Sequence, residues 1–495
     1  MPVLGADKVL VEKYAVDFSI PRELAEIVVR RFPEYSEAQR YLFPNVDNLH
    51  DPVTMPDITT AAQGIMAAVK SGEGILIYTH DDVDGYTSAA VMYKALDDIT
   101  RGSGTVHIYP IIREQDGYVL NSQILRSYRE KGVTLLLTVD FGISNEENPR
   151  IAEQEGMKAI ICDHHETQLT KFQVPAVDPK RKDSKYPFRE LAGVGVAFKL
   201  AQVLYQQFFS MSASEFYNLK KSFFPIVCIG TLSDRVILRD ENRVFCTRGM
   251  QLMNQIEDPW AAYLQEEGGV DINRLLREVS PTIGSAAYVD PRLGVEFFIE
   301  RDMGKVKEYY NRLKETDQKR RQETDELFSN VVSSAEVNSR IVLSLIPLSK
   351  QHYLGSIAAR LRDYFKRNSL IIGVKDEKCI GELRSCDIDL YKLLYRMRRF
   401  FMDFGGHQRA AGFSMGKNNL QAFLDEFKQY VREGTPDFIN DCGSRVPEPE
   451  AFLRRSDVGM LKMLMPFGEG NPAPILTDGI SSYTVDNSLN LVERV

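Results

Sequence analysis

The chain has 495 residues, 43% of them hydrophobic and 26% charged, which is ordinary for a globular protein of several domains. It contains no apolar run of about 18 residues and no leader pattern, so we expect neither a transmembrane helix nor a signal peptide. The net charge of −8 argues against bulk electrostatic binding of duplex DNA. The six cysteines are scattered without a C-x-x-C pair, which indicates a reduced, cytoplasmic protein.

The pattern of helices and strands divides the chain into five parts. Residues 1–60 read as a helical lead-in, and from about 61 to 245 helices and strands alternate as in an α/β domain. Residues 246–300 are predicted to be helical with loops, and 306–337 form one long charged helix. A second α/β segment runs from 339 to about 434, and the rest holds little beyond a Pro/Gly turn at 466–472.

Four short apolar runs in the first α/β segment end in acidic or histidine residues. Such runs are typical of parallel strands buried on both faces, whose carboxyl ends line the ligand crevice. A single carboxylate at such a place is commonly a helix cap, but four together favour a metal site. The runs, each given with the polar residues that follow it, are 75–78 (His80, Asp82, Asp84), 133–139 (Asp140), 158–162 (Asp163, His164, His165) and 224–230 (Asp234).

The run Asp163-His164-His165 is the strongest of these signals, because the whole chain has only seven histidines. Carboxylate oxygens and imidazole nitrogens together suit a divalent transition metal such as Mn²⁺. Two metals about 4 Å apart can hold a water-derived nucleophile and the reacting oxygens of a phosphoryl transfer. Asp82 and Asp84 are two residues apart, so in an extended segment their side chains would share one side. We expect Gly85 to let the backbone turn into a helix over 86–96.

These motifs resemble the DHH phosphoesterase superfamily, and within it the RecJ-type single-strand-specific exonucleases. A second block, Gly405-Gly406-His407 followed by Ala410-Ala411-Gly412, resembles the DHH-associated domain. Further likeness lies in Arg113, in the stretch 191–198, in Arg384-Ser385 and in the 466–472 turn. Together the motifs cover roughly residues 35 to 475.

The resemblance implies hydrolysis of single-stranded DNA from 5′ to 3′ with two Mn²⁺ or Mg²⁺ ions, in DNA repair or recombination. His80, His164 and the aspartates listed below would bind metal. His165 would bind metal or phosphate, and Asp163 would orient an imidazole. The catalytic residues would be Asp82, Asp84, Asp140, His164, His165 and Asp234. The metal ligands would be His80, Asp82, Asp84, Asp140, His164 and Asp234. The substrate contacts would be Arg113, Arg384, Ser385, Gly405, Gly406 and His407.

The resemblance also implies the fold: a parallel-sheet catalytic domain, joined by a long helix to a smaller α/β DHH-associated domain. The chain ends before a full OB-fold, so we expect a C-terminal stub and weaker binding of long strands. The expected parts are 1–60 as lead-in, 61–300 as DHH domain, 301–337 as connecting helix, 338–435 as substrate-binding domain and 436–495 as partial OB-like extension.

Two departures from the family pattern leave other functions open. His80 replaces an aspartate, and Glu382 stands where a serine is usual, beside the expected phosphate position. A carboxylate there would repel phosphate. The alternatives are therefore a phosphodiesterase for short oligonucleotides or cyclic dinucleotides, and a catalytically weak scaffold in a replication or repair assembly. Retention of the acidic and histidine residues argues against the scaffold.

Overall fold

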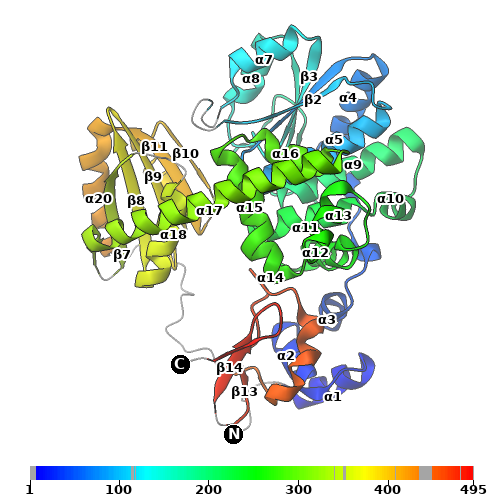
Figure 1. The fold of residues 1–495 in the computed structure, drawn as a ribbon, viewed down its shortest axis with the longest axis vertical. Helices are drawn as coiled ribbons and strands as arrows, with labels where there is room; N and C mark the ends of the chain where they lie inside the picture. Colours follow the sequence, from blue (N-terminus) through cyan, green and yellow to red (C-terminus); the bar gives the residue numbers. More distant parts are fainter. Residues whose placement is uncertain are drawn as a thin grey trace. The chain divides into compact units, whose positions relative to one another are not determined.

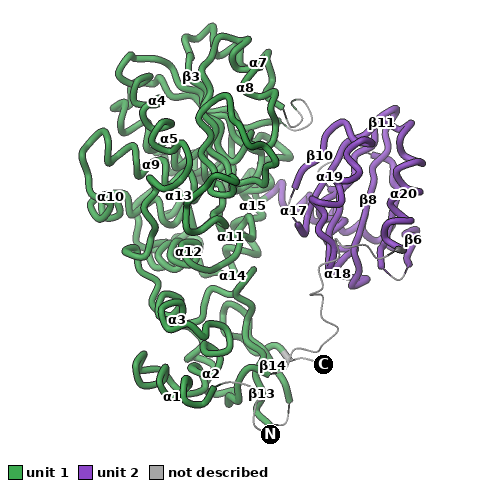
Figure 2. Tube along the Cα trace, turned by 180° about the vertical axis from the view of Figure 1, so that it is seen from behind, with its two compact units in different colours: residues 1–314, 447–495 green, residues 315–446 purple. Residues whose placement is uncertain are grey.

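A computed structural model describes residues 7–112, 116, 119–338, 340–348, 353–406, 408–433, 449–479 and 481–493. The chain divides into two compact units, residues 1–314 with 447–495 and residues 315–446 (Figures 1 and 2). No helix among the described residues is long and apolar enough to cross a bilayer.

The first unit is built on a sheet of five parallel strands, β1 (Gly74–Thr79), β2 (Val106–Pro110), β3 (Val133–Val139), β4 (Lys158–Cys162) and β5 (Ala176–Val177). The strand order is β2-β1-β3-β4-β5. The chain therefore places β2 on one side of β1 and then returns to place β3 on the other side of β1. In doubly wound folds this reversal, between β1 and β3, opens the ligand crevice at the carboxyl ends of the strands.

Both faces of this sheet are covered by helices, as the continuous apolar strands predict. Ile75 and Ile77 of β1 face one core, which the helices α4, α5 and α9 complete. Leu76 and Tyr78, one residue out of phase, face a second core with α7 and α8. These helices are α4 (Ile58–Lys70), α5 (Val83–Ile99), α7 (Ser122–Arg129), α8 (Glu147–Gln154) and α9 (Gly193–Phe209).

After β5 the first unit continues as helices, so the alternation that we predicted up to residue 245 ends near residue 177 among the described residues. The apolar run 224–230, predicted as a strand, lies inside the buried helix α11. A helix that is apolar all round cannot be told from a buried strand by periodicity. The helices are α10 (Ala213–Leu219), α11 (Phe223–Asp234), α12 (Asp240–Met253), α13 (Pro259–Glu266), α14 (Ile272–Arg274), the π turn η3 (Leu275–Val279), α15 (Ser280–Gly284), η4 (Ser285–Tyr288) and α16 (Arg292–Ile299).

The predicted long helix is present as α17 (Met303–Ser334), and it runs from the first unit into the second. The second unit holds a six-stranded sheet of order β10-β11-β9-β8-β7-β6, in which only β7 and β8 are parallel. Its elements are β6 (Glu336–Val337), β7 (Ile341–Pro347), α18 (Tyr353–Phe365), β8 (Asn368–Lys375), β9 (Lys378–Arg384), α19 (Leu390–Arg396), η5 (Arg398–Phe400), β10 (Asp403–Gly406), β11 (Ala410–Gly416), η6 (Lys417–Asn419) and α20 (Leu420–Glu433).

The two ends of the chain share one hydrophobic core, although the sequence suggested separate segments. Near the N-terminus lie α1 (Lys8–Asp17), α2 (Arg22–Arg31), α3 (Tyr35–Leu42), η1 (Val46–Asn48) and η2 (Pro52–Thr54). The C-terminal segment adds η7 (Arg455–Leu464) and a sheet of β12 (Ala451–Phe452), β13 (Leu476–Thr477), β14 (Ser482–Val485) and β15 (Leu491–Glu493).

Arg243 of α12 connects these two ends to the helical part of the first unit. Its buried guanidinium donates to the carbonyls of Tyr41 (2.7 Å), Leu464 (3.1 Å) and Met463 (2.7 Å), and it lies 4.0 Å from the Tyr41 ring centroid. One side chain therefore satisfies backbone acceptors from both ends of the chain.

Replacing Arg243 by Met should destabilise this junction by about 3 kcal/mol, because it leaves buried carbonyls without donors. We expect the first thermal unfolding transition to move to lower temperature. The same change at Arg248, on the same helix but bonded only to Gln251, is the control. Equal unfolding temperatures for the two variants would contradict this role of Arg243.

Candidate metal centre

The predicted metal-binding residues meet at the carboxyl edge of the parallel sheet, beyond β1, β3 and β4. This is the reversal point of the strand order, where doubly wound folds bind their ligands. Because the three strands end at the same edge, polar side chains from distant parts of the sequence become neighbours. Asp234 reaches the same place from a helix.

After β1, Asp82 caps α5, and Asp84 lies in the first turn of that helix. Asp82 accepts a hydrogen bond from the Gly85 N–H at 2.9 Å and lies 3.0 Å from His80 Nδ1. We had predicted an extended segment here and a helix from residue 86. The structure instead begins the helix at Val83, so the segment is not extended. Gly85 lies within the helix, and its role is close approach: a Cβ there would lie 2.5 Å from the His80 carbonyl oxygen.

Asp84 is buried against the N-terminus of α9. Its two carboxylate oxygens accept hydrogen bonds from the backbone N–H groups of Gly193 (2.7 Å) and Val194 (2.9 Å). The free N–H groups at the start of a helix favour an anion at this position. A remote segment of the chain therefore holds the carboxylate in place.

After β3, Asp140 takes a left-handed backbone conformation, with φ of 54°. Aspartate tolerates this conformation better than most residues, and such strain commonly accompanies functional sites. Gly193 packs against the Asp140 side chain so closely that a Cβ on it would lie 2.7 Å from Asp140 Oδ1. The glycine at the start of α9 thus makes room for Asp140 as well as binding Asp84.

After β4, Asp163 organises the two histidines that follow it. Its Oδ1 accepts from the His164 N–H at 2.7 Å and lies 2.7 Å from His165 Nδ1, while its Oδ2 accepts from the Ile143 N–H at 2.9 Å. Asp163 thereby orients an imidazole, which is the role that the sequence suggested for it. A ring fixed through Nδ1 directs Nε2 away from the aspartate.

His164 lies at the centre of three carboxylates. Its Nδ1 lies 2.9 Å from the Leu191 carbonyl oxygen, so Nδ1 carries the proton and donates it. Its Nε2 lies 3.1 Å from Asp140 Oδ1 and 3.7 Å from both Asp84 Oδ2 and Asp234 Oδ2. In the neutral imidazole a lone pair on Nε2 therefore points at three anionic groups.

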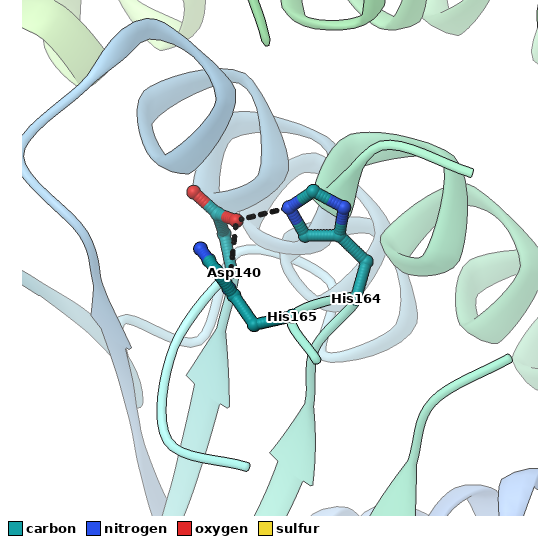
Figure 3. A group of neighbouring side chains, drawn as sticks. All are labelled: Asp140, His164 and His165. Carbon is teal, nitrogen blue, oxygen red and sulfur yellow. Dashed lines mark ion pairs between the residues drawn. The ribbon is translucent and has the colours of Figure 1, made fainter. Parts of the chain in front are cut away.

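Overlapping groups of side chains offer ligand atoms within 4.8 Å of one another. Asp140 belongs to two of these groups and His164 to two, so the shared residues could serve adjacent cations; Asp140 and the two histidines are drawn in Figure 3. The groups are Asp140 with His164 and His165, His80 with Asp82 and Asp140, and Asp84 with His164 and Asp234.

This donor set fits a divalent cation. Asp140 Oδ1 and Asp234 Oδ2 are buried and accept no hydrogen bond from the described residues, although both face His164 Nε2. Buried carboxylate oxygens that face a lone pair are unfavourable unless positive charge lies between them. Oxygen ligands mixed with imidazole nitrogens suit Mn²⁺ and related ions.

The pKa values of the cluster also show that its carboxylates lack compensating positive charge. Burial, and then the neighbouring Asp82 carboxylate, raise the pKa of Asp84 to about 7. Burial followed by the charges of Asp84 and Asp82 raises the pKa of Asp140 and of Asp234 well above the usual range. Burial lowers the pKa of the His165 imidazole, but the Asp163 carboxylate outweighs it and raises the pKa to about 9.

The two histidines differ in what can reach them. The His164 side chain is 1% exposed, whereas that of His165 is 29% exposed. His164 is therefore almost closed to solvent. His165 is open to contact from solvent.

The predicted substrate residues of the second unit lie on β9, β10 and the turn after β9. Arg384 Nη1 donates to Glu382 Oε2 at 2.9 Å, so its charge is already paired. The buried Ser385 hydroxyl lies 3.0 Å from Asn368 Oδ1 and accepts from the Ile388 N–H at 2.6 Å, and it thus stabilises a turn. Gly405 and Gly406 end β10. Arg113 and His407 lie outside the described residues.

Two contributors to the site were not singled out as such from the sequence. Gly193 was noted only as part of a stretch of family likeness, and the Leu191 carbonyl that binds His164 has no side-chain signal at all. The sequence also contains a basic run, Lys180-Arg181-Lys182, whose members lie in different environments. Lys180 is buried near His165, Arg181 is buried and paired with Asp57 and Asp183, and Lys182 is exposed.

Comparison with known proteins agrees with this arrangement. The family model for the DHH family, N-terminal domain, matches residues 74–231, and that for the DHHA1 domain matches residues 341–433. The chain is 29% identical over 476 residues to the single-stranded-DNA-specific exonuclease RecJ of Bacillus subtilis, in an alignment that covers 91% of this chain but 58% of that protein. It is 25% identical over 449 residues to the RecJ of Escherichia coli K12, with coverage of 84% and 77%. It thus spans little more than half of the first of these relatives.

Solved structures show the same fold. RecJ from Thermus thermophilus in complex with Mn²⁺ superposes with a TM-score of 0.80 at 20% identity, over 99% of this chain and 73% of that one. A second structure, an exonuclease RecJ bound to manganese, gives a TM-score of 0.63 at 22% identity, over 77% and 96%.

Substituting Gly193 by Ala should weaken binding of Mn²⁺ by at least about tenfold, since the new methyl displaces Asp140 and disturbs the bond to Asp84. Isothermal titration calorimetry measures the affinity. Gly195→Ala, two residues later on α9, is the control, because its Cβ would meet only Leu191 side-chain atoms at 3.2 Å and beyond. Unchanged Mn²⁺ affinity in Gly193→Ala would show that Asp140 and Asp84 do not form the cation site.

Proposed function

Because the chain belongs to the DHH superfamily, in its RecJ-type branch, we propose that it is a metal-dependent phosphodiesterase that degrades single-stranded DNA as a 5′ to 3′ exonuclease. The substrate, the direction and a role in DNA repair or recombination rest on likeness to the relatives. Two Mn²⁺ or Mg²⁺ ions are the proposed cofactors.

The observation that carries the proposal is the set of overlapping groups at the sheet edge, in which Asp140 and His164 are shared. Hydrolysis of a phosphodiester needs an activated water and stabilisation of the negative charge on the phosphate. Divalent cations held there would supply both as Lewis acids. The sharing of ligands supports a pair of cations in preference to one.

The protein's own residues hold this chemistry in place. Asp84 and Asp140 would be fixed ligands, since α9 restrains both. His164 would bind through Nε2, because the Leu191 carbonyl holds its Nδ1. His80, Asp82 and Asp234 complete the ligand set, and the more exposed His165 would contact a cation or the phosphate. In the second unit, Arg384, the Gly405-Gly406 end of β10 and His407 would bind the strand. Arg113 is the proposed strand contact of the first unit.

One feature of the second unit favours the alternative that the substrate is a short oligonucleotide or a cyclic dinucleotide. Glu382 lies beside Arg384, in space that exists because Gly412 and Gly355 have no side chains. A Cβ on Gly412 would lie 2.9 Å from Glu382 Oε1. A phosphate that binds Arg384 must therefore displace a carboxylate, at a cost from repulsion. Such competition would lower the affinity of Arg384 for a terminal phosphate.

The scaffold alternative has less support, because a buried carboxylate cluster without a cation destabilises a protein that has no use for it. We place the protein in the cytoplasm, a proposal supported by its cysteines. Among the described residues, the buried Cys162, Cys228, Cys246 and Cys379 all carry free thiols.

With Mn²⁺ the protein should release mononucleotides from a long 5′-phosphorylated single strand, and EDTA should stop the reaction. Asp140→Ala should abolish hydrolysis, by at least about a thousandfold, because it removes a shared ligand. The exposed Asp363→Ala in the second unit is the control. A dinucleotide is tested in parallel. Cleavage of the dinucleotide alone would favour the small-substrate alternative, and cleavage of neither would revive the scaffold.

Glu382→Ser should raise the preference for 5′-phosphorylated over 5′-hydroxyl strands several-fold, because it frees Arg384 for the phosphate. The ratio of kcat/KM for the two strands measures it. Glu377→Ser, an exposed position in the adjacent turn, is the control. An unchanged ratio would argue that the terminal phosphate does not bind at Arg384.

A further inference from the structure

Lys180 is a buried cation at the edge of the metal centre that the proposed set of ligands does not use. Its side chain is 6% exposed. It lies just beyond β5, at the carboxyl edge of the sheet from which the site residues project. A lysine is rarely buried to this degree without a partner that accepts its hydrogen bonds.

The ammonium group of Lys180 forms no hydrogen bond within the described part of the chain. Its nearest anionic atoms are Glu166 Oε1 at 3.9 Å and Glu190 Oε2 at 3.8 Å, both beyond hydrogen-bond distance. Those two side chains are 47% and 42% exposed, so water screens them. The protein thus leaves the donors of the ammonium poorly satisfied, while most of the side chain that carries them is buried.

These contacts place Lys180 between two segments that also build the metal centre. Glu166 follows His165, and Glu190 precedes Leu191, whose carbonyl binds His164. His165 is the one of the two histidines that is open to solvent.

The backbone of Lys180 is held rigidly. Its N–H donates to Asp178 Oδ1 at 2.6 Å, and its carbonyl accepts from the Arg189 guanidinium. Just before it, the Val177 carbonyl accepts from the Asp163 N–H at 2.9 Å. The strand end that positions the Asp163-His164-His165 run therefore also positions the lysine, which reduces the entropy cost of using it.

We propose that Lys180 contacts a phosphate of the nucleic-acid strand at the metal centre, through its ammonium group. The inference deepens the proposed function and rests on it. A phosphate entering a carboxylate-lined crevice is repelled by the carboxylates that remain uncompensated. A fixed ammonium at the edge attracts the phosphate and supplies donors to its oxygens. Lys180 is thus a substrate-contacting residue and not a metal ligand.

The test compares Lys180→Gln and Lys180→Arg with Lys182→Gln, which makes the same change at an exposed position two residues away. With Mn²⁺ and a single strand, Lys180→Gln should lower kcat/KM by about tenfold or more, mostly through KM, and Lys180→Arg should recover part of it. The dependence of log KM on log salt should become shallower by about 0.7. Lys182→Gln should match the wild type.

Two further measurements separate this role from others. Mn²⁺ affinity and unfolding temperature should not fall in Lys180→Gln; if both fall with activity, the lysine is structural and the inference is wrong. Strand binding is also measured by fluorescence anisotropy with Ca²⁺ in place of Mn²⁺. If the wild type binds the strand but does not hydrolyse it with Mn²⁺, the proposed function is wrong. The strand affinity of Lys180→Gln relative to the wild type then still tests the inference about Lys180. Binding and kcat/KM equal to wild type overturn it.

Discussion

The main constraint on this structure is a cluster of carboxylates that the fold holds close to His164. Three carboxylates lie within 3.1 to 3.7 Å of one imidazole nitrogen, in a place that water hardly reaches. Without positive charge this arrangement is unfavourable, so the surrounding fold must supply the energy that keeps it. That energy comes from the two cores on either face of the parallel sheet, which fix the strand ends.

The restraints on the cluster come mainly from backbone. The first N–H groups of α9 bind Asp84, the Leu191 carbonyl binds His164, and Gly193 allows Asp140 to approach. Backbone groups that are packed in the protein interior move less than exposed side chains. The proposed ligands would therefore be held ready for a cation, which lowers the entropy cost of binding it.

Asp234 shows how the helical half of the first unit takes part. It ends α11, which packs tightly on α12: a Cβ on Gly249 of α12 would lie 2.4 Å from Cys228 Cβ. The helix α12 in turn carries Arg243, which binds backbone from both ends of the chain. One proposed ligand of the candidate metal centre is thus connected, through two packed helices, to the core that the chain ends share.

The sequence alone determined three of the five parallel strands of the first sheet, the long helix and the residues that gather at the candidate metal centre. Apolar runs ending in Asp and His carry both signals, because burial and ligand chemistry are local properties of residue type. Only the tertiary structure decided that residues 224–230 are helical, since an all-apolar run has no period. It also decided that the chain ends share a core, that Glu382 pairs with Arg384, and that Lys180 is buried beside the site. These depend on contacts between residues far apart in the chain, which no local pattern encodes.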